Sequence, residues 1–283
     1  MRPFLTFLSL FTLFFFLTPI LCLSVPASAA QPPAATLPQT VPTEGVDQGC
    51  ADVILGMVAA MDLRGYHPET LKAAAVICTT QFLKTYAETG TGDGLSYLTP
   101  DEAKAAWGDY WFSQYWDQMQ QAVTEVWGMV LTEGEGLFSP SVFALSWGKT
   151  EEGIECPRDH TANGFSTQIT VPLEEFTAVF PRYSASLKVK TAPSGRVESV
   201  TSGDTVLSGY EMMERFSLPS PAFTLTVTSS GAEFSCKGNG RGTGMSLYGA
   251  NELAKQGKNF RELLATFYPT ATLQEINRSL GSK

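Results

Sequence analysis

Four glycines alternate with other residues near the C-terminus, in the stretch Gly238-Asn239-Gly240-Arg241-Gly242-Thr243-Gly244. Glycine has no Cβ atom and enters positive φ without steric cost, so such a segment can turn sharply or admit other atoms very closely. A predicted strand precedes it and a helix-like segment, 251–258, follows it. The stretch therefore predicts a loop that either surrounds a ligand with backbone N–H groups or lets two elements of the fold touch.

Nucleotide and nucleic-acid binding are excluded as functions of this loop. No Gly-Lys-Ser/Thr motif is present, and after the loop only about 40 residues remain, too few for a second strand with an acidic residue. The formal net charge is −9, whereas phosphate neutralisation requires clustered Lys and Arg.

The order of the predicted elements indicates an α+β fold in a single large domain, 49–276. Apolar residues at helical spacing predict helices over 52–62 and 68–88. A capping box, Thr99-Pro100-Asp101-Glu102, opens a long aromatic helix that carries Trp107 to Trp127. Alternating residues then predict a mostly antiparallel β region, with strands at 129–133, 142–146, 166–171, 186–190, 196–200, 223–227 and 232–236. Two helices, 246–256 and 260–267, close the domain.

The N-terminal residues predict export. Arg2 precedes an almost wholly apolar run, Phe4 to Leu23, and Ala27-Ser28-Ala29 forms a cleavage site. Residues 1–29 are therefore a signal peptide, or a membrane anchor if they are not cleaved. The Pro-, Ala- and Thr-rich stretch 30–48 is an extended linker. We expect an extracytoplasmic protein, secreted or anchored, that meets the membrane only through this N-terminal segment.

Four cysteines remain after the signal: Cys50, Cys78, Cys156 and Cys236. An even number in an exported protein permits two disulfides, and buried thiols are the alternative. Cys156 and His160 are four residues apart, but Pro157 interrupts a helix there and no CxxC pair is present. We expect neither a metal site nor a cofactor.

Several further segments resemble, in collinear order over roughly 51–273, the stage II sporulation protein D family and its amidase-enhancer relatives. The C-terminal signature is Gly-Met-Ser-x-Tyr-Gly-Ala, residues 244–250, followed by a Leu-Ala-x-x-Gly helix. The other matching segments are His67–Val76, Ser194–Val197, Leu207–Gly209, Phe216–Phe223 and Arg261–Pro269.

The resemblance implies a lytic transglycosylase fold that acts on peptidoglycan, largely on glycan strands stripped of stem peptides. This reaction needs one carboxyl group that protonates the glycosidic oxygen, and that group must have a raised pKa to stay protonated near neutral pH. The candidate acids in this part of the chain are Glu69, within the matching segment His67–Val76, and Asp62, shortly before it.

The chain departs from the family pattern at polar positions. Where the family has Glu-Met-Pro, this chain has Ala60-Met61-Asp62, so the expected catalytic carboxyl is missing. Thr79 and Gln81 replace an arginine and a tyrosine, and Arg241 and Leu247 replace a histidine and a glutamine. Since glycines and apolar positions are retained, we expect a kept fold with a degenerate catalytic centre.

The predicted function is binding of glycan strands, or assistance to a cell-wall hydrolase or amidase. One alternative is an active lytic transglycosylase with Asp62 or Glu69 as acid and base, and another is a structural partner in an envelope or sporulation complex. The predicted glycan-binding cleft lies near Ala60, Glu69 and the glycine loop. Its loop residues are Arg241, Gly242, Gly244, Ser246 and Tyr248. We expect most rings of the aromatic helix to pack in the core, and one or two exposed rings could stack on sugars.

Overall fold

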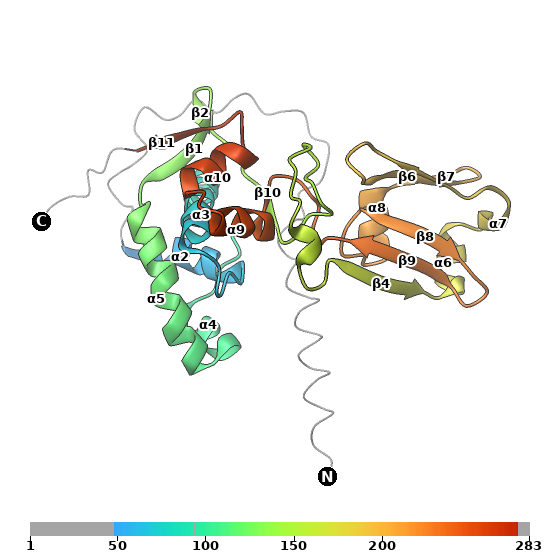
Figure 1. Cartoon of the computed structure of the whole chain (residues 1–283), viewed down its shortest axis with the longest axis horizontal. Helices are drawn as coiled ribbons and strands as arrows, with labels where there is room; N and C mark the ends of the chain where they lie inside the picture. The colour runs from blue at the N-terminus through green and yellow to red at the C-terminus, as the bar shows by residue number, and fades with distance from the viewer. Residues whose placement is uncertain (1–47, 93, 277–283) are drawn as a thin grey trace, which may run out of the picture. The chain divides into compact units, whose positions relative to one another are not determined.

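The computed structural model describes residues 48–92 and 94–276 and has the mixed α+β class that the sequence predicts (Figure 1). The chain forms two compact units. Unit 1 holds residues up to 65, 74–138 and those from 274 onward, and unit 2 holds 66–73 and 139–273. The predicted export signal, 1–29, and all but the last residue of the predicted linker, 30–48, lie outside the described residues.

Unit 1 is mainly helical. Its elements are α2 (Gln48–Ala60), most of α3 (Pro68–Thr89), α4 (Pro100–Trp107), α5 (Asp109–Glu125) and a sheet with strand order β11 (Thr272–Glu275), β1 (Met129–Glu133) and β2 (Gly136–Leu137). The predicted capping box opens α4: the Thr99 side chain accepts from the Glu102 N–H, and the Glu102 carboxylate accepts from the Thr99 N–H. No helix in the described part of the chain is both long and apolar enough to cross a bilayer.

The long aromatic helix of the prediction is two helices. Gly108 adopts φ 81° between α4 and α5, a conformation that ends a helix because side-chain-bearing residues rarely adopt it. Trp107 and Trp116 are buried and their ring centroids lie 6.4 Å apart, whereas Tyr110 and Trp111 are exposed. The aromatic stretch thus contributes both to the core of unit 1 and to its surface.

The core of unit 1 includes a wholly buried part of α3, from Ala74 to Thr80. Because consecutive residues point in all directions around a helix, this part of α3 is covered on every side. Thr80 is polar but satisfied, because its Oγ1 donates to the Val76 carbonyl and accepts from the Leu131 N–H of β1 at 3.0 Å.

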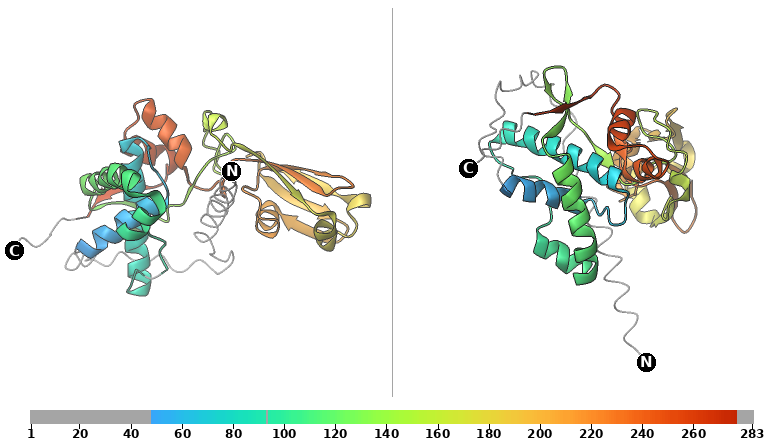
Figure 2. Two further views of the ribbon diagram at one scale, coloured as in Figure 1. Left: turned by 90° about the horizontal axis from the view of Figure 1, so that it is seen from below. Right: turned by 60° about the vertical axis from the view of Figure 1, so that its left-hand side comes forward.

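Unit 2 contains two antiparallel three-stranded sheets, shown from further directions in Figure 2. One has the order β4 (Ser166–Val171), β9 (Ala232–Lys237), β8 (Phe223–Val227), and the other β5 (Lys188–Thr191), β6 (Val197–Ser202), β7 (Thr205–Ser208). Three short helices accompany them: α6 (Leu173–Val179), α7 (Tyr183–Ser186) and α8 (Gly209–Arg215). One apolar core joins both sheets to α6 and α8, with Phe176, Phe180, Met212, Phe216 and Phe234 at its centre.

The rest of unit 2 carries the glycine loop and the last helices. A short parallel pair, β3 (Val142–Phe143) and β10 (Met245–Ser246), precedes α9 (Leu247–Lys255) and α10 (Phe260–Phe267). A 3₁₀ turn, η1 (Asp159–Thr161), lies between β3 and β4 in the sequence. These elements position the residues of the candidate site.

Candidate functional site

The glycine loop, residues 238–244, connects β9 to β10, and close packing explains its glycines. Gly242 and Gly244 have φ of 86° and 81°. A Cβ atom on Gly242 would overlap the Trp147 ring, and one on Gly244 would overlap the Ser141 carbonyl oxygen. Of the two roles that the sequence left open for the loop, close approach of two elements is therefore the one the packing requires.

Most of the loop's N–H groups already have acceptors within the protein. Gly238 donates to the Phe165 carbonyl, Asn239 to Leu145, Gly240 to Pro219 and Met245 to Ser141, at 2.7–3.0 Å. The Gly244 N–H donates to the Glu152 carboxylate at 3.1 Å. These donors are therefore committed to the protein, and they fix the loop backbone at both of its ends.

The loop ends at a buried carboxyl group. Ser246 caps α9, since its side chain accepts from the Gly249 N–H. Its Oγ also donates to Oδ2 of Asp159 at 2.8 Å, and the Ser146 N–H donates to the same oxygen at 2.8 Å. Asp159 is fully buried, and burial raises the pKa of its carboxyl group although the bonds from Ser146 and Ser246 oppose this.

The side chains that the loop turns outward come from Arg241, Thr243 and the nearby Tyr248. Arg241 pairs with Glu214 at 2.8 Å and lies over the ring of Tyr210. The Tyr248 hydroxyl lies 3.1 Å from Oγ1 of Thr161, in η1. Of the predicted loop residues, Arg241 and Tyr248 are thus partly accessible, while Gly242, Gly244 and Ser246 are buried and act in packing.

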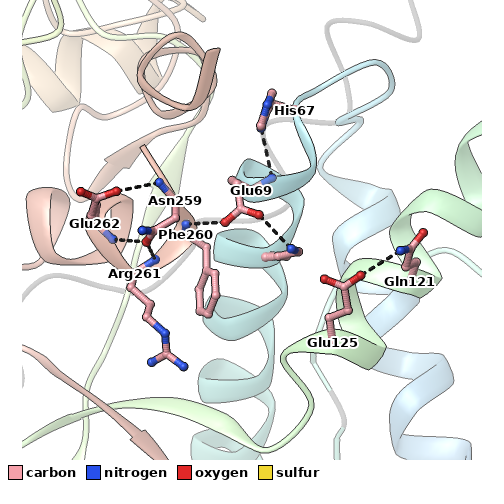
Figure 3. A network of polar contacts seen from close by, with 9 residues as sticks. His67, Glu69, Gln121, Glu125, Asn259, Phe260, Arg261 and Glu262 are labelled. Atoms are coloured by element: carbon pink, nitrogen blue, oxygen red, sulfur yellow. Dashed lines mark hydrogen bonds and ion pairs between the residues drawn. The ribbon is translucent and has the colours of Figure 1, made fainter. Parts of the chain in front are cut away.

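Glu69 lies in the first turn of α3 and joins that turn to α10 (Figure 3). Its Oε2 accepts from the Phe260 N–H at 2.8 Å, and its Oε1 accepts from Lys72 Nζ at 2.8 Å. The same segment also contacts α9, because the His67 N–H donates to Asn251 Oδ1. Two segments that the family resemblance identified, one early and one late in the chain, therefore meet in unit 2.

These contacts fix the charge of Glu69. Burial alone would raise the pKa of its carboxyl group, but the hydrogen bonds from Lys72 and the Phe260 N–H, together with the Lys72 charge, lower it overall. Glu69 is therefore ionised at neutral pH, which is the opposite of the state that a general acid requires.

Asp62 belongs to unit 1, in the turn after α2, and is exposed. Its carboxylate forms an ion pair with Arg64, with Oδ2 at 2.9 Å from Nη2, and Arg64 lies over the Trp107 ring. Asp62 has φ 50°, a left-handed conformation that is uncommon outside glycine. Ala60, where the family pattern has its acid, is the exposed last residue of α2.

Two of the other positions at which this chain departs from the family pattern, Thr79 and Leu247, serve packing here. Thr79 is buried and donates to the Ala75 carbonyl within α3, and Leu247 is buried at the start of α9. At these two positions, a polar side chain of the family pattern is replaced by a buried one that is either apolar or hydrogen-bonded within its own helix. They are consistent with the predicted retention of the fold.

Cys156 lies in a segment without regular secondary structure and His160 in the 3₁₀ segment, so the two do not share a helical face. Burial raises the pKa of the Cys156 thiol to about 12, with the Asp159 charge acting in the same direction, and His160 Nδ1 lies 2.6 Å from the Pro157 carbonyl. Within residues 48–92 and 94–276, no group of three or more His, Cys, Asp or Glu side chains could hold a metal ion. Cys156 and Cys236 are buried thiols.

Sequence reasoning missed the residues that hold the loop from other parts of the chain. Trp147, Glu152, Asp159 and Tyr210 all come from segments distant in sequence. Only Tyr210 had a local signal nearby, since Ser208 and Glu211 form a capping box that opens α8.

Comparison with known proteins agrees with the family resemblance. No protein-family model matches the chain. Stage II sporulation protein D of Bacillus subtilis (strain 168) is 24% identical to it over 267 residues, which cover 81% of this chain and 76% of that protein. Stage II sporulation protein D of Bacillus amyloliquefaciens is 23% identical over 261 residues, covering 81% and 75%.

Proposed function

The chain is a divergent member of the stage II sporulation protein D family and hence a sporulation-related protein, and from this premise we propose that it binds peptidoglycan glycan strands without cleaving them. In this proposal the protein acts outside the cytoplasm, and its N-terminal segment either is removed after export or anchors it. It binds the strands either by itself or together with a cell-wall hydrolase or amidase. No cofactor is required.

The charge of Glu69 is the observation that carries the non-catalytic part of the proposal. A lytic transglycosylase must protonate the glycosidic oxygen, so its acid has to be neutral before the reaction. The Glu69 carboxylate is stabilised in its ionised form by Lys72 and the Phe260 N–H, and both of its oxygens are occupied. Ala60 replaces the family's expected acid, and the candidate Glu69 is ionised, so neither residue offers the neutral carboxyl group that the reaction needs.

The glycine loop supports the binding part. Its backbone is held by carbonyl groups and by Glu152, so its shape does not depend on a ligand. It turns Arg241 and Thr243 outward, and a fixed surface with exposed polar groups binds a polyhydroxylated ligand with little loss of conformational entropy.

The test uses the purified chain and peptide-stripped glycan strands in one tube. Protein that sediments with the insoluble strands is measured, and soluble products are examined by mass spectrometry. We expect bound protein and no anhydro-ended fragments. Fragments would contradict the non-catalytic assignment. Protein that stays in the supernatant, yet is captured with an envelope protein, would instead favour a purely structural partner.

Asp62 supports the alternative of a retained lytic transglycosylase. It is exposed and adopts a left-handed backbone conformation, which is common at functional sites when the surrounding structure imposes it. If the wild type releases anhydro-ended fragments, the Asp62→Asn and Glu69→Gln variants identify the acid. Loss of fragments in only one of two folded variants assigns the acid to that residue.

A further inference from the structure

Two guanidinium groups lie over the ring of Tyr210, in α8. The Cζ atom of Arg241 is 4.5 Å from the ring centroid, and that of Arg196 is 5.0 Å from it. Both distances lie within the range of a cation–π interaction. Arg241 replaces the histidine of the family's Gly-His-Gly pattern, so this arrangement follows from one of the departures of this chain.

The two arginines use their N–H donors differently. Arg196 donates through Nε to Glu151 and through Nη1 to the Val197 carbonyl, and its side chain is 17% exposed. Arg241 makes one described side-chain hydrogen bond, from Nη1 to Glu214, and is 30% exposed. A guanidinium group has five N–H donors, so Arg241 retains donors for a ligand while Arg196 is committed to the fold.

The position of Arg241 is fixed before any ligand arrives. The Tyr210 hydroxyl donates to the Arg241 carbonyl at 3.3 Å, and the neighbouring Gly240 N–H and Gly242 carbonyl are bonded to Pro219 and Glu151. Burial, aided by the Glu151 charge, raises the pKa of Tyr210, so the ring stays neutral at neutral pH. A stacked, preorganised arginine loses less conformational entropy on binding than a free one.

The present partner of Arg241 is weakly held. The Glu214 side chain is 65% exposed and contributes one oxygen to the pair. Exposed ion pairs contribute between nothing and about 1 kcal/mol to stability. A ligand carboxylate that reaches two N–H groups in a planar, bidentate arrangement would bind more strongly than this single bond.

We propose that Arg241 recognises a carboxylate group on the glycan, and that Glu214 occupies part of this position when no ligand is bound. This inference rests on the proposed function and names the ligand class more closely, as an anionic glycan. In peptide-stripped peptidoglycan, the lactyl carboxyl group of N-acetylmuramic acid is free and supplies such a group. Intact stem peptides convert that carboxyl group to an amide, so Arg241 favours stripped strands.

The experiment compares two preparations of the same peptide-stripped strands, one untreated and one with its carboxyl groups converted to neutral methylamides. We expect the full-length wild type to bind the untreated strands about tenfold more tightly, the range expected for hydrogen bonds to charged groups. Arg241→Gln should bind both preparations with the weaker affinity. Arg215→Gln removes the same charge from an exposed position in α8 and should retain the preference.

Glu214→Gln tests the second half of the proposal and leaves the glycine loop untouched. Removal of the competing carboxylate should raise affinity for untreated strands severalfold and leave affinity for methylamidated strands unchanged. An unchanged affinity for both would overturn the role of Glu214. If Arg241→Gln fails to fold, Arg241→Lys keeps the charge without the planar fork and should lose most of the preference.

The outcomes separate this inference from the proposed function. Equal binding of both preparations by the wild type would overturn carboxylate recognition and leave glycan binding intact. Binding of neither preparation would overturn both proposals. A preference that survives in the folded Arg241→Gln variant would assign the carboxylate site to another residue.

Discussion

Ser246 Oγ donates a 2.8 Å hydrogen bond to Oδ2 of Asp159, although 87 residues separate the two in sequence. The same oxygen accepts from the Ser146 N–H, in the segment after β3. One buried carboxyl group therefore joins the start of α9, the 3₁₀ segment and the strand region that supports the glycine loop. Ser246 belongs to the family signature, whereas Asp159 is not marked by any local pattern.

Asp159→Ala should lower the free energy of unfolding by about 2–4 kcal/mol. Two hydrogen bonds are lost, and the Ser146 N–H and Ser246 hydroxyl stay buried without their acceptor. Urea unfolding measures the change. Asp204→Ala is the matched control, because that carboxylate is fully exposed in a turn and should change stability by less than about 0.5 kcal/mol. Equal losses in the two variants would contradict the role assigned to Asp159.

The stability contributed by Asp159 should fall as pH rises. Burial raises the pKa of its carboxyl group in the folded state, with Glu252 acting in the same direction. Because the pKa of Asp159 is higher in the folded than in the unfolded state, its stabilising contribution is complete below the unfolded pKa, about 3.9. This contribution is lost as the pH rises through the folded pKa. The neighbouring Cys156 thiol has a pKa of about 12 and stays protonated in this range.

Asp159→Asn isolates this effect, because the amide does not titrate and keeps an acceptor oxygen. Relative to Asp159→Asn, the wild type should become less stable, by unfolding free energy, as the pH rises from about 4. A difference that is constant with pH would show that Asp159 has an ordinary pKa.

Gly242→Ala should destabilise the protein by about 3 kcal/mol. The new methyl group would overlap the Trp147 ring, and alanine is strained at φ 86°. Gly257→Ala separates these two causes, since Gly257 has φ 97° but no atom lies within 4 Å of the position that a Cβ atom would occupy there. We expect a loss of about 1 kcal/mol for the control, from backbone strain alone. Thermal unfolding of both variants measures the two values.

The sequence predicted correctly those strands and helices in which apolar residues alternate or recur at helical spacing. Strands β1, β4 and β8 and helix α10 begin and end where the sequence places them. The three short helices α6, α7 and α8 were missed because four to seven residues carry too little periodicity. Gly108 shows a second limit, since one residue with positive φ divides a stretch that is helical in composition on both sides.

The candidate site was less predictable because long-range contacts decide its chemistry. The glycine spacing predicted a loop, but Trp147, against which Gly242 packs, lies far away in sequence. Glu69 was a candidate acid on its residue type and position alone. Its charge depends on the Phe260 N–H, 191 residues later, which no local pattern indicates.

Glu69→Gln tests this last point through stability. The lowered pKa of Glu69 means that its stabilising contribution is present above the unfolded value, about 4.3, and is lost as pH falls through the folded value. We expect the variant to be about 1 kcal/mol less stable than the wild type at neutral pH, with the gap closing in acid. Glu88→Gln, at an exposed position of the same helix, should show no such gap. A gap that instead widens in acid would mean that the Glu69 carboxyl group has a raised pKa, and Glu69 would regain its place as the candidate general acid.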